Sequence, residues 1–173
     1  MNQMRPQPDG QCPASRYLAR TPESLVVGGY RGWLHFVTER NAASLETIQS
    51  QFVRHLGKPT ALVAMAGLES MIRQLGTCAG CPLRCFCQGS QHLCRDECLI
   101  LGLISGLQNG EDEAAYLSAG NLSSNARASE VVASAGEFAM ALKFAGQQLL
   151  PIPVDTVHWI IKGGQAAPNP TLH

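Results

Sequence analysis

Six of the chain's seven cysteines lie in one short segment, between Cys78 and Cys98. Free cysteines that serve only as core residues are normally scattered among the elements that they pack. A cluster of thiols in a chain without an export signal is more typical of metal binding or redox chemistry. The segment is therefore where chemistry is expected, and the spacing of its thiols indicates which kind.

The spacing predicts a zinc site with four thiolate ligands. Cys78 and Cys81 form a C-x-x-C knuckle, which turns the backbone tightly enough for two sulfurs to face one ion. Cys94 and Cys98 are four residues apart, so in a helix they lie on one face. We expect Cys78, Cys81, Cys94 and Cys98 to converge on one zinc ion with a structural role.

Three further residues are alternates for this site. Cys85 and Cys87 are two apart, and side chains at that spacing in an extended segment point in opposite directions. At least one of them is therefore expected to be spare. His92 is the third alternate, because zinc accepts imidazole as readily as thiolate, although a solvated histidine in the first turn of a helix is the simpler explanation.

Other kinds of site use the same residues. An iron-sulfur cluster would take Cys78, Cys81 and Cys85 with a distant fourth cysteine. Cys78 and Cys81 would also suit a redox or cofactor-delivery dithiol, although no strand pattern precedes them. A small zinc enzyme with an open coordination position is a further possibility, and so are thiols that bind nothing. No catalytic residue is identified, and a non-enzymatic role is favoured.

Composition limits the partners. The 173 residues carry 13 basic and 13 acidic side chains, so no net field attracts nucleic acid. Only 15% of residues are charged and 45% are hydrophobic, which favours a homodimer that hides part of the surface. The first residues lack the apolar segment of a signal peptide, so a reducing cytoplasm is expected. No apolar run is long enough to cross a membrane.

Apolar residues recur at helical spacing along most of the chain. The sequence predicts an all-α bundle of about five to six helices, with at most one short C-terminal strand. A single domain is expected over 21–162, between a flexible arm (1–20) and a disordered tail (163–173). The segment 154–161 fits either the strand or a short covering helix.

Capping residues and glycines set the expected boundaries. Thr21 begins the first long helix, and Gly76 ends the helix that precedes the cysteine-rich loop. Ser90 is expected to cap the next helix, which is apolar almost all round and so forms the buried centre of the fold. Gly102 and Gly106 in that helix predict that another helix approaches it closely.

Overall fold

The computed structural model describes residues 13–163, and within that range it contains only helices and their connections. The predicted all-α class is confirmed. Two short helices, at the two ends of the described range, bring the number above the expected five to six. The elements are α1 (Pro13–Leu18), α2 (Thr21–Glu39), α3 (Ala42–Leu56), α4 (Lys58–Cys78), α5 (Arg95–Asn109), α6 (Asp112–Leu122), the 3-10 turn η1 (Asn125–Arg127), α7 (Ala128–Phe144) and α8 (Val154–Ile161).

Two of the predictions concern the ends of the chain. Cys12 and most of the predicted arm and tail lie outside the described residues. The segment 154–161, for which a strand and a helix both fitted the pattern, is the helix α8. None of the helices in the described range is both long and apolar enough to span a bilayer.

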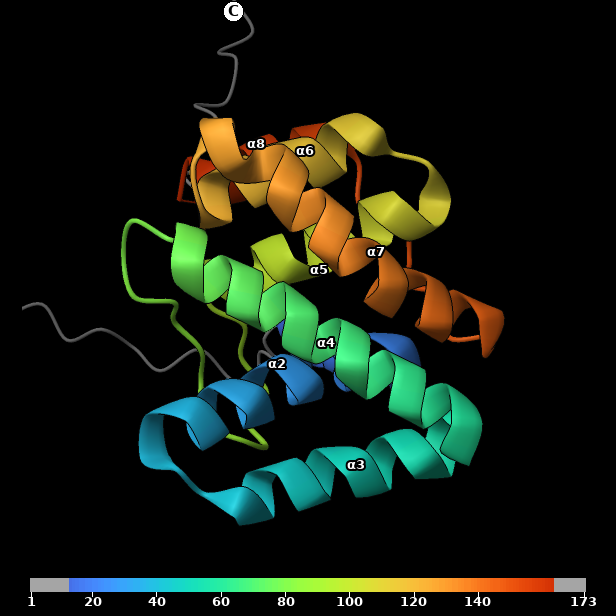
Figure 1. The fold of residues 1–173 in the computed structure, drawn as a ribbon. Coiled ribbons are helices and arrows are strands. Elements are labelled where there is room, and N and C mark those ends of the chain that lie inside the picture. The colour runs from blue at the N-terminus through green and yellow to red at the C-terminus, as the bar shows by residue number, and fades with distance from the viewer. Residues whose placement is uncertain (1–12, 164–173) are drawn as a thin grey trace, which may run out of the picture.

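Helix α5 lies at the centre of the bundle, as predicted. Figure 1 shows α4 and α7 lying against each other across the front of the molecule, with α5 behind them. Helices α2 and α3 cover one end of this core, and α6 and α8 cover the other. Four large apolar side chains of α5 are completely buried, those of Leu99, Ile100, Leu103 and Ile104.

Glycines allow the central helices to approach closely. A Cβ atom built on Gly102 would lie 2.6 Å from the Ser118 hydroxyl of α6, and one on Gly106 would lie 2.8 Å from the Ala115 amide nitrogen. The close approach predicted from these two glycines is therefore confirmed. Gly67 of α4 meets α7 in the same way, since its Cβ would lie 2.6 Å from the backbone nitrogen of Phe138.

The helix boundaries beside the cysteine-rich segment differ from those expected. Helix α4 continues through Gly76 to Cys78, so this cysteine belongs to a helix and not to the loop. Helix α5 begins at Arg95 with Cys94 as its N-cap, so Ser90 does not cap it. The reason is a carboxylate within the helix itself, since Glu97 accepts the Cys94 backbone N–H at 2.8 Å.

Candidate functional site

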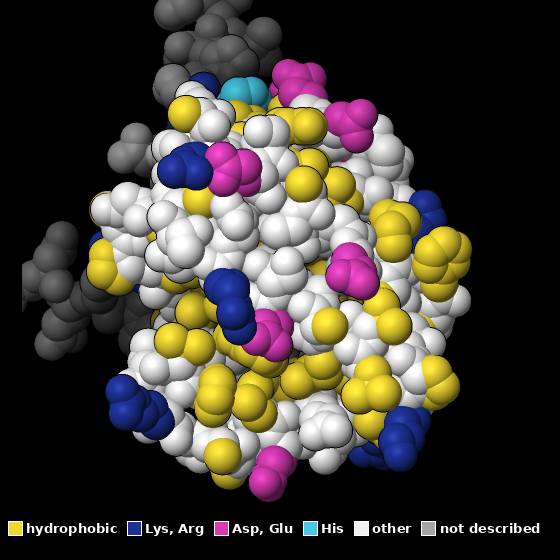
Figure 2. Space-filling model, in the orientation of Figure 1, with side chains coloured by type: hydrophobic (Ala, Val, Ile, Leu, Met, Phe, Trp, Pro, Cys, Tyr) yellow, Lys and Arg dark blue, Asp and Glu magenta, His cyan; other side chains and the backbone are white. Residues whose placement is uncertain are grey.

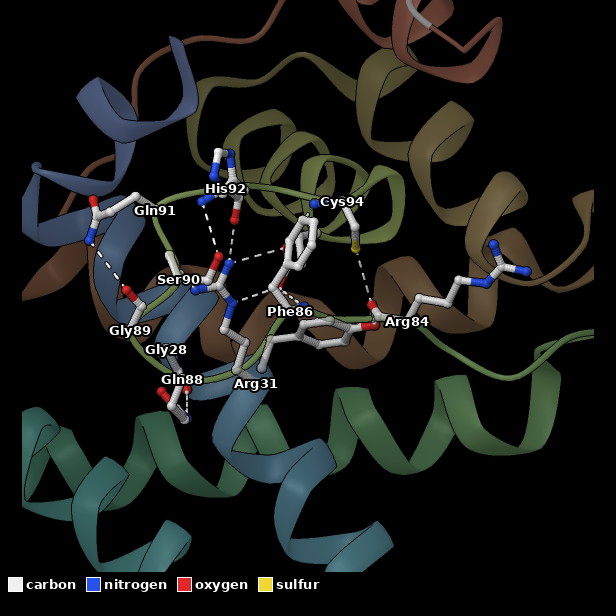
Figure 3. Close-up of polar contacts among 12 residues, drawn as sticks. Gly28, Arg31, Arg84, Phe86, Gln88, Gly89, Ser90, Gln91, His92 and Cys94 are labelled. Carbon is white, nitrogen blue, oxygen red and sulfur yellow. Dashed lines mark hydrogen bonds and ion pairs between the residues drawn. The ribbon is translucent and has the colours of Figure 1, made fainter. Parts of the chain in front are cut away.

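The connection between α4 and α5, residues 79–94, contains neither helix nor strand, and a buried ion pair holds it in place. The Arg31 Nε of α2 donates to Glu97 Oε1 of α5 at 2.6 Å, and only 4% and 0% of the two side chains are exposed. Arg31 also donates to the carbonyls of Ser90 at 2.8 Å and His92 at 2.6 Å (Figure 3). The guanidinium therefore ties α2 to both the loop and the start of α5.

Glu97 completes the same network from the other side. Besides Arg31, its carboxylate accepts the backbone N–H of Phe86 at 3.0 Å and that of Cys94 at 2.8 Å. A buried carboxylate with this many donors is electrostatically satisfied. This one side chain therefore fixes the middle of the loop and the first turn of α5 together.

The sequence pattern does not indicate this pair. The neighbouring Asp96 contacts residues close to it in the sequence, since its carboxylate accepts the Arg84 backbone N–H at 2.9 Å and lies 3.7 Å from the Arg95 guanidinium. Glu97 instead pairs with Arg31. A signal was present in its position three residues after Cys94, which is the capping-box spacing with cysteine in place of serine.

Two donors converge on one backbone carbonyl within the loop. The Tyr30 hydroxyl donates to the Arg84 oxygen at 3.1 Å, and the Cys94 thiol donates to the same atom at 3.4 Å (Figure 3). Burial raises the pKa of Cys94 to about 11, and burial followed by the charge of Glu97 also raises the pKa of Cys85. Both thiols are therefore protonated at neutral pH in the absence of a metal.

Two of the predicted ligands line one pocket. Cys81 from the loop and Cys94 from the start of α5 both face a hollow of about 420 Å³. The end of α6 closes its third side. The remaining polar lining comes from Arg84, Arg95, Asp96, Asn121 and Ser123. The pocket lining thus includes two cysteines and two arginines.

The other two predicted ligands flank this pocket in sequence. Cys78 is the last residue of α4, and its sulfur accepts a hydrogen bond from the Gln74 amide at 3.1 Å. Cys98 lies in the first turn of α5, one turn after Cys94, and is half-buried. The structure therefore brings Cys81 and Cys94 to a common pocket but does not place all four sulfurs around one point.

The alternates differ in exposure. Cys85 is half-buried, whereas Cys87 and His92 are exposed, and the His92 ring lies 6.1 Å from the Phe86 ring. Five cysteines of the described range are free thiols, namely Cys78, Cys81, Cys85, Cys87 and Cys94. Across residues 13–163, no three histidine, cysteine or acidic side chains are grouped closely enough to hold a metal ion as they stand. A metal would therefore need a rearrangement of the loop.

Comparisons with protein-family models, curated proteins and solved structures find no match to this chain. The chemistry of the cysteine-rich segment is accordingly the basis for a functional proposal.

Proposed function

We propose that the segment 78–98 binds a zinc ion with a structural role, through Cys78, Cys81, Cys94 and Cys98. One observation carries the proposal: Cys81 and Cys94, which come from separate segments, line the same pocket. Cys78 lies one knuckle before Cys81, and Cys98 lies one helical turn after Cys94. Each pocket thiol thus has its expected partner beside it along the chain.

To close this site, the first part of the loop, around Gly80 and Cys81, must move. Gly80 has open space where a Cβ would stand, and Cys81 is exposed, so the knuckle has room to turn. The part from Arg84 onward is anchored by the contacts of Tyr30, Arg31 and Glu97. Zinc binding would therefore reposition the loop near Cys81 while leaving the start of α5 in place.

The charges around the pocket suit such a site. Four thiolates around a zinc ion carry a net charge of about minus two, which neighbouring cations stabilise. Arg84 and Arg95 both line the pocket and supply those cations. Binding also requires the Cys94 thiol to lose its proton, so zinc affinity should fall as the pH is lowered.

Elemental analysis of the purified protein tests the metal directly. One zinc per chain in a colourless sample supports the proposal. Iron with inorganic sulfide in a brown sample would instead support an iron-sulfur cluster. Zinc that exchanges an external ligand would support the alternative of a small enzyme with an open coordination position.

Variants test which thiols bind the metal. Cys94→Ser or Cys98→Ser should lower the free energy of unfolding by several kcal/mol, because a structural zinc contributes directly to folding. The melting temperature should fall steeply as a result. Cys87→Ser is the matched control, because Cys87 is exposed and outside the proposed set. If Cys98→Ser melts like the parent and still binds one equivalent of zinc, the four-cysteine assignment is wrong.

We also infer that the protein acts in the cytoplasm, where thiols stay reduced and available to a metal. Five free thiols of the described range, those of Cys78, Cys81, Cys85, Cys87 and Cys94, support this inference. Trapping thiols with an alkylating agent in intact cells tests it, because a protein from an oxidising compartment would resist labelling.

A further inference from the structure

Cys94 contacts the backbone carbonyl of the residue that precedes Cys85. The Cys94 sulfur lies 3.4 Å from the oxygen of Arg84, the residue bonded directly to Cys85. Standard peptide geometry places the Cys85 Cα about 2.8 Å from that oxygen, so the Cys94 sulfur and the Cys85 Cα are at most about 6 Å apart. The Cα atoms of a disulfide lie about 4.4 to 6.8 Å apart, so the Cys94 Cα must also come within that range of the Cys85 Cα. With the Cys94 sulfur already within about 6 Å of the Cys85 Cα, rotation of the two side chains and a local adjustment of the backbone would bring the sulfurs into bonding range.

A second observation places the two thiols in one neighbourhood. The Tyr30 hydroxyl is bound to the same Arg84 oxygen. The pKa of Tyr30 is raised, first by burial and then by negative charge at Asp96, Cys94 and Cys85. Both sulfurs therefore lie close enough to the phenol to act on it. Cys85 and Cys94 are also both half-buried, unlike the exposed Cys81 and Cys87.

We propose that Cys85 and Cys94 form a disulfide when the reduced protein meets a two-electron oxidant such as hydrogen peroxide. One thiolate attacks the peroxide, breaking its O–O bond, and becomes a sulfenic acid as water is released. The second thiol then displaces the sulfenic oxygen as another water, and the S–S bond forms. The two sulfurs lose two electrons to the peroxide, and both thiol hydrogens end in water.

This disulfide would regulate the metal site, a consequence that rests on the proposed function. Cys94 is a proposed zinc ligand, and only a thiolate can ligate the ion. A Cys94 that is bonded to Cys85 therefore cannot hold zinc, and a Cys94 that holds zinc is protected from the oxidant. Oxidation and metal binding exclude each other at this one sulfur.

Peptide mapping of a Cys87→Ser variant tests the bond without ambiguity. Trypsin cleaves after Arg84 and Arg95, so residues 85–95 form one peptide whose only remaining thiols are Cys85 and Cys94. The chelator-treated, reduced variant is exposed to hydrogen peroxide, alkylated and digested. We expect this peptide to lose both alkylation labels and to become lighter by two hydrogens. A Cys81→Ser substitution in the same background is the control and should leave this result unchanged.

The outcomes separate the disulfide from the metal. If Cys94 keeps its label, or is found joined to the peptide that contains Cys81, the proposal is overturned. Repeating the oxidation with zinc bound should preserve both labels. If the protein binds zinc but forms no Cys85–Cys94 disulfide when zinc is absent, the disulfide proposal is overturned and the zinc site stands. A disulfide that forms equally well with zinc present would uphold the pair and remove Cys94 from the zinc ligands.

Discussion

The Arg31–Glu97 pair is the side-chain contact on which the cysteine-rich loop depends most. It joins residues 66 positions apart, and both charges are out of contact with water. Such a pair is seldom a large source of net stability, but each charge is costly when its partner is removed. The loop carbonyls of Ser90 and His92 would lose their donor in the same change.

Arg31→Met should therefore lower the free energy of unfolding by about 3 to 5 kcal/mol, because it leaves the Glu97 carboxylate buried without its cation. Denaturant unfolding of the metal-free protein measures the effect. Arg73→Met is the matched control, since Arg73 pairs with Glu69 on the exposed surface of α4 and should change stability by less than about 0.5 kcal/mol. Equal effects of the two substitutions would contradict the role given to the buried pair.

The Cys94 thiol should show an unusual pH dependence. Burial raises its pKa from the ordinary 9.0 to about 11, so the folded protein holds this proton more tightly than the unfolded chain does. Its contribution to stability is complete below pH 9 and is lost as the pH rises through about 11. The same shift keeps the fraction of reactive thiolate low near neutral pH.

In the metal-free protein, iodoacetamide at pH 8 should therefore label Cys94 more slowly than the exposed Cys87. The rate at Cys94 should keep rising with pH until the thiol is ionised, near pH 11. Mass spectrometry of peptides after timed labelling measures both rates. Labelling of Cys94 as fast as that of Cys87 at pH 8 would show that the thiol is not protected by burial.

At the scale of elements, the contact between α4 and α7 depends on Gly67. Its Cα faces the backbone of α7, and an added Cβ would lie 2.6 Å from the nitrogen and 2.9 Å from the Cα of Phe138. Backbone atoms cannot rotate away as a flexible side chain can. The two helices must therefore separate to admit any side chain at this position.

Gly67→Ala should destabilise the fold by about 1 to 3 kcal/mol, because it overpacks this helix contact. Gly76→Ala is a matched control in the same helix, where nothing lies within 4 Å of the built Cβ. There alanine should be neutral or stabilising by up to about 1 kcal/mol, as expected from its higher helix propensity. Thermal or denaturant unfolding of both variants measures the difference, and a neutral Gly67→Ala would contradict the close packing.

At the scale of the whole molecule, the assembly prediction rests on the exposed surface. The apolar run of α5 and the glycines Gly29 and Gly32 of α2 pack inside the single chain. What remains exposed includes Val53, Leu62 and Val63 on α3 and α4. Figure 2 shows the face over α3, α4 and α7, where charged side chains stand singly or in pairs among hydrophobic and neutral ones.

We continue to expect a symmetric dimer, because a surface with so few charges is readily covered by a second copy. Light scattering should give twice the chain mass at micromolar concentration. Leu62→Glu, which places a charge at a side chain that is 57% exposed, should shift the mass toward the monomer if this face is the interface. A monomer mass for the parent chain at low micromolar concentration would contradict the prediction.

Local residue patterns determined much of the fold. Apolar side chains at helical spacing, the proline-containing start of α2 and the glycine after α5 indicate helices whatever surrounds them, because capping and amphipathicity act within a few residues. The same local information located the thiols and the close approach at Gly102 and Gly106. It did not reveal where the helices beside the cysteine-rich loop end and begin.

Tertiary contacts decided that boundary and the orientation of the thiols. Helix α5 starts at Arg95, and not near Ser90, where Glu97 binds the Cys94 backbone N–H and the distant Arg31 neutralises its charge. No periodic pattern encodes a partner 66 residues away. The attraction between two distant charges acts only once folding has brought them together in a site with little water, so the setting of Cys94 follows from the assembled structure and not from the spacing of its neighbours.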